Sequence, residues 1–394
     1  MMKRRVWIFF LLALILVLAA GGLWWVRRLS RQVNLAGSLG EGGVAEVTVP
    51  DGFAVKVFAE GLNGPRFIAF GTDGVLYVAD RGAGRIVALP DLDGDGVSDE
   101  VQVFAEGVNS PHSLVYHEGA WYIGVPTGVV RLTDTDGDGT ADEAVTLIDD
   151  YPTGGHSTRT VIFLPDGRMA VSIGSSCNVC EETDPRRAGI VVYADPVRSS
   201  ERQFAESERQ LAAGLRNAVG LAIHPETGAL WATNNGRDLL GDDLPPETVN
   251  LVREGADFGW PRCHSGEVID PDFGFPGACE GVEPPVATWQ AHTAPLGLVF
   301  YTGTNFPAEY QGDLFIALHG SWNHSTGVGY SVVRLPLDGS IQAGPVEDFA
   351  TGWLNLAVHE VTGRPVGLAV GPDGALYVSD DKGGVIYRIV WTGE

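Results

Sequence analysis

The chain has 394 residues, of which 44% are hydrophobic and 9% aromatic, so it has enough apolar material to bury a core and is not disordered. Its 53 glycines and 23 prolines disfavour a helical bundle and favour short strands joined by tight turns. The 26 basic and 50 acidic residues leave a formal charge of −24, which repels phosphate backbones. We therefore expect no nucleic-acid partner, and a neutral small substrate or bound cations fit better.

Residues 1–28 have the composition of a transmembrane anchor or a signal peptide. Residues 6–26 carry no charge and follow a basic cluster at 3–5. A helix of this length, at ~1.5 Å per residue, can cross a hydrocarbon core of ~30 Å. The basic cluster predicts a cytoplasmic N-terminus and a body on the outer side of the cell membrane. We favour a single-pass anchor over a cleaved signal, which would leave a secreted or periplasmic protein; 29–45 is then a linker and 46–394 the body.

The four cysteines agree with export. Cys177 and Cys180 form a CxxC motif, and Cys263 and Cys279 flank a loop rich in glycine and proline. In an oxidising compartment this arrangement predicts two local disulfides. Covalent haem attachment needs a histidine directly after CxxC, and Glu181 stands there instead.

An internal repeat predicts the architecture. Residues 57–66 (VFAEGLNGPR) recur as 103–112 (VFAEGVNSPH), and repeats near this period are typical of propellers and solenoids. A tight turn followed by an alternating apolar strand occurs six times, at 73–78, 118–123, 166–171, 227–232, 311–316 and 373–378. Each copy follows another short apolar segment, so the pattern is strand, turn, strand. We predict an all-β, six-bladed β-propeller whose last blade is completed by an outer strand at 53–59 beside 385–390.

Basic and amide side chains open the expected inner strands. They are Arg66, His112, His156 with Arg159, Arg216 with Asn217, and Arg364, while Pro295 opens the remaining strand. Inner strands of a propeller start together at the mouth of the channel, so these side chains are predicted to form one ring. Such a ring in an acidic protein indicates an anionic ligand. The alternative is that the arginines brace loops and the histidines are satisfied core residues.

Four segments in chain order carry a family resemblance: GHSTR at 155–159, GLRNAVGL at 214–221, FGWP at 258–261, and GRPVGL at 363–368 followed by PDGALYVSDD at 372–381. Together they resemble the pyrroloquinoline-quinone (PQQ) dependent sugar dehydrogenases over about residues 52–392. The segments SSCNVC at 175–180 and HGSWN at 319–323 are most similar to the sorbosone dehydrogenase-like branch.

The resemblance implies roles for the ring residues. His156 would be the general base that takes the proton of the sugar's anomeric hydroxyl while hydride passes to a quinone carbonyl carbon. Arg216 and Asn217 would hold the quinone's carbonyl oxygens, with Arg216 stabilising the charge that develops there. Arg364, and with it Arg159 or Arg66, would pair with the carboxylates of PQQ.

The chain departs from the glucose-oxidising relatives at two positions. Those relatives place an acid directly before the base, where this chain has Gly155. They also use a lysine on the cofactor, where this chain offers His319. His112 is a weaker candidate for the same pocket.

Two acidic loops predict calcium. Asp91, Asp93, Asp95 and Asp99 occupy positions 1, 3, 5 and 9 of the first loop, and Asp134, Asp136, Asp138 and Asp142 repeat the pattern 43 residues later. Alternate aspartates around a glycine turn suit a cation with six to eight oxygen ligands. The loops are similar to EF-hand loops without the helices or the twelfth-position glutamate, and the alternative is an acidic solvated turn. The family resemblance implies a separate, catalytic Ca²⁺ with the main-chain carbonyls of Gly236 and Arg237 as ligands.

Three functions are compatible with these patterns. The first is PQQ-dependent oxidation of an aldose or related aldehyde sugar, with electrons passed to an unidentified acceptor. The second is a calcium-dependent sugar-lactone hydrolase, which needs carboxylates and asparagines at the inner-strand starts, where this chain has mainly arginines and histidines. The third is a non-catalytic binding propeller on a membrane tether.

The localisation is testable by cell fractionation. We expect the full-length protein in the membrane fraction, with the body accessible to protease from the outer side, because residues 6–26 form an uncharged span behind basic residues. N-terminal sequencing of the mature protein distinguishes the alternatives. A soluble product that begins near Ala20 would show a cleaved signal peptide.

Overall fold

The computed structural model describes residues 44–338, 344–358 and 360–393, so the expected anchor and nearly all of the expected linker lie outside it. Apart from α2 (Glu201–Ala205) and the 3-10 turns η2 (Arg81–Ala83) and η3 (Ala308–Tyr310), its regular elements are strands. In this part of the chain, no helix combines the length and apolarity that a membrane crossing requires.

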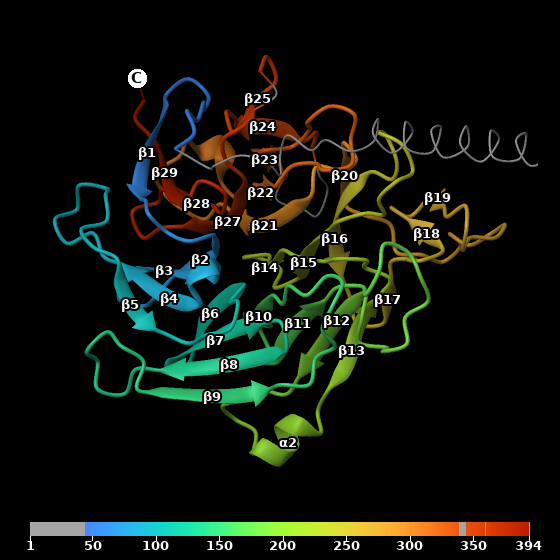
Figure 1. The fold of residues 1–394 in the computed structure, drawn as a ribbon, viewed down its shortest axis with the longest axis horizontal. Coiled ribbons are helices and arrows are strands. Elements are labelled where there is room, and N and C mark those ends of the chain that lie inside the picture. Colours follow the sequence, from blue (N-terminus) through green and yellow to red (C-terminus); the bar gives the residue numbers. More distant parts are fainter. Residues whose placement is uncertain (1–43, 339–343, 359, 394) are drawn as a thin grey trace, which may run out of the picture.

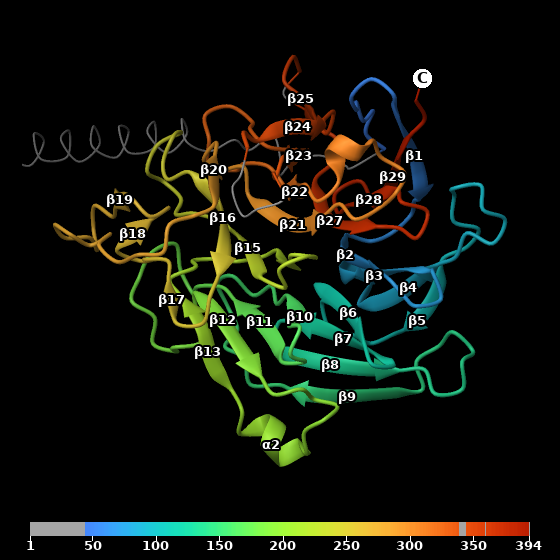
Figure 2. The same ribbon diagram turned by 180° about the vertical axis from the view of Figure 1, so that it is seen from behind.

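Six antiparallel sheets surround a common centre, as Figures 1 and 2 show from opposite sides. Blade 1 contains β2 (Pro65–Phe70), β3 (Leu76–Asp80), β4 (Arg85–Leu89) and β5 (Gln102–Ala105). Blade 2 contains β6 (Ser113–His117), β7 (Ala120–Val125), β8 (Gly128–Thr133) and β9 (Glu143–Ile148). Blade 3 contains β10 (Val161–Phe163), β11 (Met169–Ile173), β12 (Gly189–Tyr193) and β13 (Arg209–Ala213), extended by β17 (Ala256–Asp257).

The second half of the ring has the same pattern. Blade 4 contains β14 (Leu221–Ile223), β15 (Leu230–Asn234), β16 (Glu247–Val252) and β20 (Ala287–Trp289). Blade 5 contains β21 (Pro295–Phe300), β22 (Leu314–Leu318), β23 (Ser331–Leu335) and β24 (Glu347–Ala350). Blade 6 contains β27 (Pro365–Val370), β28 (Leu376–Asp380), β29 (Val385–Trp391) and β1 (Phe53–Ala59). Two small hairpins, β18 (Cys263–His264) with β19 (Val268–Ile269) and β25 (Leu354–Asn355) with β26 (Glu360–Val361), lie in loops. The six-bladed all-β prediction is confirmed.

The two ends of the described body close the ring in blade 6. Strand β1 pairs with β29 in antiparallel register, from Phe53 opposite Trp391 to Ala59 opposite Ile386. The Phe53 ring also makes an edge-on contact with Phe349 of blade 5, at 5.1 Å between ring centroids. The predicted outer strand at 53–59 is therefore confirmed, and it joins the chain's beginning to its last blade.

Tight turns between first and second strands follow from local chemistry. In blade 1, the Asp73 carboxylate accepts the N–H of Val75 at 3.0 Å, while Gly74 has a φ of 80°, which favours glycine. The same Asp-Gly turn in blade 6 has Asp373 accepting the N–H of Ala375 at 3.1 Å. These turns explain why the strand-turn-strand pattern could be found in the sequence.

The blades pack through buried apolar side chains, and the inner strands adjoin one another around the axis. Between blades 1 and 2, the rings of Tyr77 and Trp121 lie 4.4 Å apart. Near the axis, hydroxyl groups connect successive blades. Ser113 of β6 donates to the carbonyl of Arg159 at 2.9 Å, and Thr233 of β15 donates to that of Leu296 at 2.8 Å.

The start of the body and both disulfides are also defined. Ala45, at the end of the expected linker, is buried and donates its N–H to the Tyr387 hydroxyl at 2.8 Å. Cysteines 177 and 180 form one disulfide and cysteines 263 and 279 the other, as predicted. Both bridges lie outside the blades: the first joins residues of the loop between β11 and β12, and the second begins in the small hairpin strand β18.

Candidate functional site

A cavity of about 200 Å³ lies where the inner strands begin. Apart from Glu247 in β16, its lining residues come from segments that precede first strands or follow second strands, and they include His156, Arg216, Asn217 and Arg364 of the predicted ring. They are His156, Arg216, Asn217, Asn235, Gly236, Asp238, Glu247, His292, Ala294, His319, Gly320, Trp322, Asn323 and Arg364. We call this cavity the central pocket.

His156 lies on the loop between β9 and β10 and is held from behind. Its main-chain N–H donates to the Ser175 carbonyl at 2.9 Å, and its Nδ1 lies 3.1 Å from the same oxygen and 3.0 Å from Ser175 Oγ. The Ser175 hydroxyl donates its own proton to the carbonyl of Cys177 at 2.7 Å. Both Ser175 oxygens are therefore acceptors, so Nδ1 carries the ring proton of His156 and Nε2 has the free lone pair.

The environment keeps His156 neutral. Burial, followed by the nearby positive charge of Arg216, lowers the pKa of His156 to about 4. At neutral pH, Nε2 can therefore accept a proton. Among the described residues, Nε2 forms no hydrogen bond, so it is available to a ligand in the central pocket.

Arg216 opens the inner strand region of blade 4 and is 4% exposed. It donates through Nη2 to the Asp238 carboxylate at 2.7 Å and to the Asn178 side-chain oxygen at 3.0 Å. Its Nε donates to the Asn178 main-chain oxygen at 2.9 Å, which leaves Nη1 with one long contact of 3.4 Å to the Asn235 carbonyl. Nη1 is the donor with most capacity for a ligand.

Asn217 presents its carboxamide to the central pocket. Its main-chain N–H donates to the Asn234 side chain at 3.0 Å, which fixes the residue at the end of β15. Its Oδ1 is buried and has no hydrogen-bond partner among the described residues. A buried polar atom without a partner costs stability, so this carboxamide is suited to contact a bound molecule.

On the opposite wall, Arg364 and His319 are part of one polar chain. Arg364 Nη1 lies 3.4 Å from His319 Nδ1, and His319 Nε2 lies 3.0 Å from the Asp381 carboxylate. Asp381 in turn pairs with Arg66 at 2.5 Å, and Arg66 Nε lies 3.4 Å from His112 Nδ1. Arg66 and His112 therefore lie behind the pocket wall and reach it through Asp381.

The pKa shifts along this chain of polar contacts show which of its groups are charged. Despite burial, the pKa of Asp381 lies well below its usual range, because His319 and Arg66 stabilise the carboxylate. Burial lowers the pKa of His319, and burial also lowers that of His112 well below its usual value. At neutral pH the wall therefore presents the fixed cation of Arg364 beside the neutral imidazole of His319, with the neutral imidazole of His112 behind it.

The third wall contains acidic and carbonyl groups. Glu247, at the start of β16, is buried and accepts the N–H of Gly236 at 2.7 Å. Burial raises the pKa of Glu247 to about 7. The carbonyls of Gly236 and Arg237 accept no main-chain N–H among the described residues. The Arg237 side chain points to a different place, where it pairs with Asp270.

Three predicted cofactor contacts, Arg66, His112 and Arg159, do not line the central pocket. Arg159 is entirely buried, and its Nη atoms donate to the main-chain carbonyls of Pro152, His156 and Thr158 at 2.8 to 3.1 Å. It braces the loop that carries His156 and does not line the central pocket. Position next to an inner strand predicts a place in the ring for Arg159, and the family resemblance implies that it or Arg66 contacts a carboxylate. Neither determines the direction of this long side chain, which turns to the loop carbonyls.

Several residues that line the pocket or support its wall were missed by sequence reasoning. Asp381 could have been found, because a second strand ends at the same face where its neighbouring first strand begins, and β28 ends at Asp380. Asn178 had no such signal, since its contact with Arg216 joins two loops. His292 and Trp322 likewise reach the pocket from long loops whose course the repeat does not specify.

The two acidic loops occupy equivalent places, between β4 and β5 and between β8 and β9. Carboxylate oxygens of Asp91, Asp93 and Asp99 lie within 4.8 Å of one another, as do those of Asp134, Asp136 and Asp142. Asp95 and Asp138 are not in these groups; they accept the N–H groups of Val97 and Thr140, each at 2.8 Å. Three of the four predicted carboxylates in each loop therefore converge.

The protein is thus a six-bladed β-propeller with a pocket at the mouth of its channel, lined by two arginines, two acidic residues and neutral histidines. Residues 41–392 match the family described as Domain of unknown function (DUF7133). Because this match spans most of the sequence, the chain belongs to that family.

Individual relatives include an uncharacterized protein and enzymes named for PQQ-dependent sugar oxidation. An uncharacterized protein of Borreliella burgdorferi is 29% identical, over 87% of this chain and 90% of its own length. The pyrroloquinoline quinone-dependent pyranose dehydrogenase of Coprinopsis cinerea is 27% identical over 87% of this chain, and the match covers 54% of that enzyme. The named relatives are thus PQQ-dependent sugar dehydrogenases, as the sequence predicts, while the sorbosone branch stays a prediction.

Solved structures agree on the fold. The holo form of the PQQ domain of the C. cinerea pyranose dehydrogenase has a TM-score of 0.75 at 24% identity, covering 89% of this chain and 98% of that one. The calcium structure of the Trichoderma reesei carbohydrate-active enzyme of family AA12 has a TM-score of 0.76 at 22% identity, covering 90% and 98%. These similarities confirm the propeller fold.

We predict that calcium stabilises the protein through the acidic loops. The double variant Asp91→Ala/Asp134→Ala should lose most of the difference in melting temperature between calcium and chelator. The reason is mass action, since a ligand at about 100 times its Kd adds about 2.7 kcal/mol to the stability of the native state. Differential scanning calorimetry measures this, with the exposed Asp149→Ala as the matched control. An unchanged calcium dependence in the double variant would show that the loops are solvated acidic turns.

Proposed function

We propose that this protein is a PQQ-dependent dehydrogenase that oxidises an aldose or a related aldehyde sugar on the outer side of the cell membrane. The observation that carries the proposal is that one pocket contains a neutral histidine with a free Nε2 and the guanidinium groups of Arg216 and Arg364. The named relatives, which are PQQ-dependent sugar dehydrogenases, support the same chemistry.

The central pocket fits PQQ by the chemistry of its donors. PQQ is a flat dicarbonyl with several carboxylates, and Arg216 and Arg364 offer guanidinium donors at opposite walls. Arg364 Nε is a donor that is buried without a hydrogen-bond partner among the described residues. We assign Arg216 and the Nδ2–H of Asn217 to the quinone carbonyl end and Arg364 to a carboxylate. His319 accepts from Arg364 through Nδ1 and so orients that guanidinium.

In this mechanism His156 performs the proton transfer. Its Nε2 takes the proton of the anomeric hydroxyl, while Ser175 keeps the other ring nitrogen protonated and the ring oriented. When bound, PQQ supplies the carbonyl carbon that accepts the hydride from the anomeric carbon. Loss of one proton and one hydride converts the cyclic aldose into its lactone. Arg216 stabilises the negative charge that develops on the acceptor oxygen.

The calcium that the family resemblance implies has a fitting donor set in this pocket. Gly236, Asp238 and Glu247 line one wall of the pocket, and their oxygens are hard ligands. The carbonyl of the adjacent Arg237, like that of Gly236, accepts no main-chain N–H among the described residues. A divalent cation beside Glu247 would also favour the ionised form of that carboxylate, whose pKa burial raises to about 7. We therefore include Ca²⁺ with PQQ as a cofactor.

The sugar binds, on this proposal, between His156 and the pocket mouth. Trp322 lines the pocket and is 47% exposed, so its ring offers an apolar surface there. Gly155 contributes no carboxylate next to the base, which separates this site from that of glucose-oxidising enzymes. An electron acceptor outside the protein completes the cycle. The two alternative functions are a calcium-dependent sugar-lactone hydrolase and a non-catalytic binding propeller, and the same experiments distinguish them.

We predict that His156→Ala binds PQQ with nearly wild-type affinity but is reduced by sugar ~10²–10⁴-fold more slowly, the usual loss for a general base. The ectodomain, reconstituted with PQQ and calcium, is titrated spectroscopically and then mixed with a panel of aldoses in a stopped-flow instrument. Arg216→Ala should weaken cofactor binding as well as rate, which separates the two roles.

The same experiment can contradict the proposal. Wild-type reduction rates in His156→Ala would exclude the histidine as the base. A wild-type protein that binds no PQQ would favour the binding propeller, and hydrolysis of sugar lactones with calcium alone would favour the hydrolase. His117→Ala, a half-buried histidine outside the pocket, is the control.

We also predict an acid limb at unusually low pH. Because neutral His156 is the active form and its pKa is lowered to about 4, kcat/KM should be level at neutral pH and fall only as the pH decreases through about 4. A histidine with an ordinary pKa would begin to lose activity near pH ~6.5. The measurement is the pH profile of kcat/KM, with return to pH 7 after each exposure as a control for acid unfolding. A limb at the ordinary position would contradict the proposed environment.

A further inference from the structure

Two buried arginines lie behind His156, and neither meets a carboxylate. Arg159 is 0% exposed and Arg187 is 7% exposed, and neither forms an ion pair within the described part of the chain. The adjacent Arg186, in contrast, pairs with Asp150 and Asp184 near the surface. A buried cation is costly unless it is paired or fully hydrogen-bonded, so the two buried guanidinium groups need another set of acceptors.

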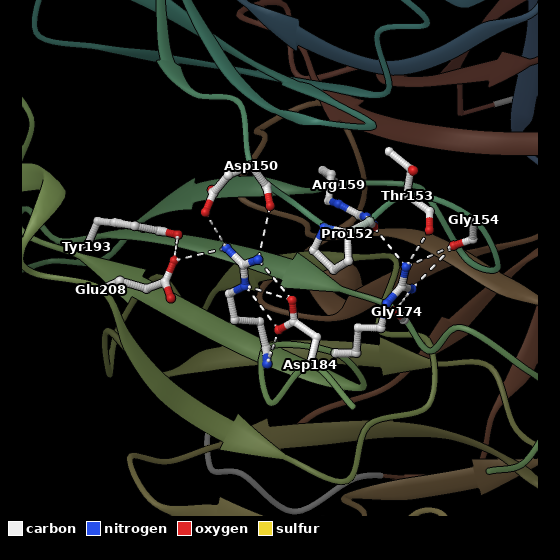
Figure 3. Close-up of polar contacts among 11 residues, drawn as sticks. Asp150, Pro152, Thr153, Gly154, Arg159, Gly174, Asp184, Tyr193 and Glu208 are labelled. Atoms are coloured by element: carbon white, nitrogen blue, oxygen red, sulfur yellow. Dashed lines mark hydrogen bonds and ion pairs between the residues drawn. The ribbon is translucent and has the colours of Figure 1, made fainter. Parts of the chain in front are cut away.

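Those acceptors are main-chain carbonyls of residues 152–158, here called the base loop. Arg187 donates to three consecutive carbonyls of this loop, those of Pro152 at 2.9 Å, Thr153 at 2.7 Å and Gly154 at 3.3 Å. It also donates to the Gly174 carbonyl, at the end of β11, at 3.1 Å. Figure 3 shows the Thr153 and Gly154 oxygens turned toward one guanidinium, while Asp150 and Asp184 surround the other.

Arg159 completes the arrangement from the other end of the base loop. It donates to Pro152 at 2.8 Å, to Thr158 at 2.8 Å and to His156 at 3.1 Å. Pro152 therefore receives both arginines, and the carbonyl of the proposed base itself is one of the acceptors. Within the described residues, none of these loop carbonyls accepts a main-chain N–H, so the arginines are their donors.

The base loop has little else to define its shape. It forms no strand, and Gly154 and Gly155 have φ values of 84° and 59°, a region that favours glycine. Its main-chain link to the neighbouring strand region is the bond from the His156 N–H to the Ser175 carbonyl at 2.9 Å. Without the guanidinium groups, a run of inward-facing carbonyls would lack donors and the loop would rearrange.

We propose that Arg187, together with Arg159, is a positioning residue for the proposed base, holding the base loop by its carbonyls so that His156 Nε2 faces the central pocket. The role of His156 rests on the proposed function, whereas the clamp itself is a property of the protein without cofactor. Neither arginine lines the central pocket, so the pair acts on the reaction through the loop.

Arginine suits this task better than lysine. Its planar group has five donors in a fixed fork, so one side chain can serve carbonyls of successive residues and of β11 together. A lysine keeps the charge but offers three donors from one nitrogen. The variants Arg187→Lys and Arg187→Ala therefore separate loss of the fork from loss of the charge.

The primary test is hydrogen exchange of the cofactor-free protein, followed by mass spectrometry. In Arg187→Ala, we expect peptides that cover 152–158 to exchange at least ~10-fold faster while the blade strands stay protected, since local opening follows local hydrogen bonding. Arg187→Lys should fall between wild type and alanine. The matched control is Arg186→Ala, which removes ion pairs of the adjacent arginine but no donor to the base loop. Unchanged exchange in both Arg187 variants would overturn the clamp.

Kinetics of the PQQ-loaded protein supply the second readout. In Arg187→Ala, we expect kcat to fall ~10- to 100-fold, because misplacing a reacting group by about 1 Å has effects of this size. PQQ affinity should stay within about threefold of wild type. A loss of PQQ affinity as large as the loss of kcat would overturn a role specific to His156.

The pH profile distinguishes a positioning role from general damage. Burial and the cations of Arg216 and Arg187 lower the pKa of His156, while the hydrogen bond to the Ser175 carbonyl raises it. The other ionisable side chains of the pocket, Asp238, Glu247, His292, His319 and Arg364, remain in every variant. Removing one cation favours protonation, so the acid limb of Arg187→Ala should move to higher pH, while that of Arg187→Lys should stay in place.

The outcomes also separate the two proposals. If exchange of the base loop accelerates in Arg187→Ala but even the wild-type protein oxidises no sugar, the clamp stands and the proposed function fails. If Arg187→Ala does not fold, judged by its melting transition, the test rests on Arg187→Lys and Arg159→Lys. Wild-type exchange and wild-type kcat in both lysine variants would then overturn the proposal.

Discussion

The close approach of six inner strands around one axis is the constraint on which the rest of the structure depends. A Cβ at Gly297 would lie 2.5 Å from the Val366 carbonyl, and one at Gly367 would lie 2.7 Å from the Arg66 carbonyl, so blades 5, 6 and 1 can meet only through glycine. This contact brings the starts of all six inner strands to one small region. The pocket is a consequence, because several side chains that precede those strands, those of His156, Arg216, Asn217 and Arg364, meet at the channel mouth.

The same convergence creates an electrostatic problem that the protein solves in three ways. Arg66 is neutralised by Asp381, which lies behind the pocket wall. Arg216 is held by Asp238 and by Asn178, so that part of its donor capacity stays available to the pocket. Arg187 is held by carbonyl dipoles alone. An acidic protein thus keeps three arginines near its centre. Each has a different partner, and of the three Arg216 keeps donor capacity for an anion in the pocket.

Much of the fold could be predicted because the repeat is local. The Asp73 and Asp373 turns, the six strand pairs and the outer strand at 53–59 follow from hydrogen bonds and apolar alternation between residues close in sequence. His156 and Arg216 could be placed at the pocket for the same reason, since both directly precede inner strands. Arg159 has the same kind of position, yet its side chain turns to the base loop, because the nearest unsatisfied carbonyls lie there.

The sequence by itself determined the number of blades, the disulfide pairs and the ring positions, because these depend on short-range pattern and on symmetry. The tertiary structure decided which ring residues face the pocket and which support it. Asp381 joins His319 to Arg66, and Asn178 meets Arg216, only because loops from different blades come together at the axis. Contacts between segments far apart in the chain depend on loop course and side-chain direction, and no periodicity in one sequence encodes either.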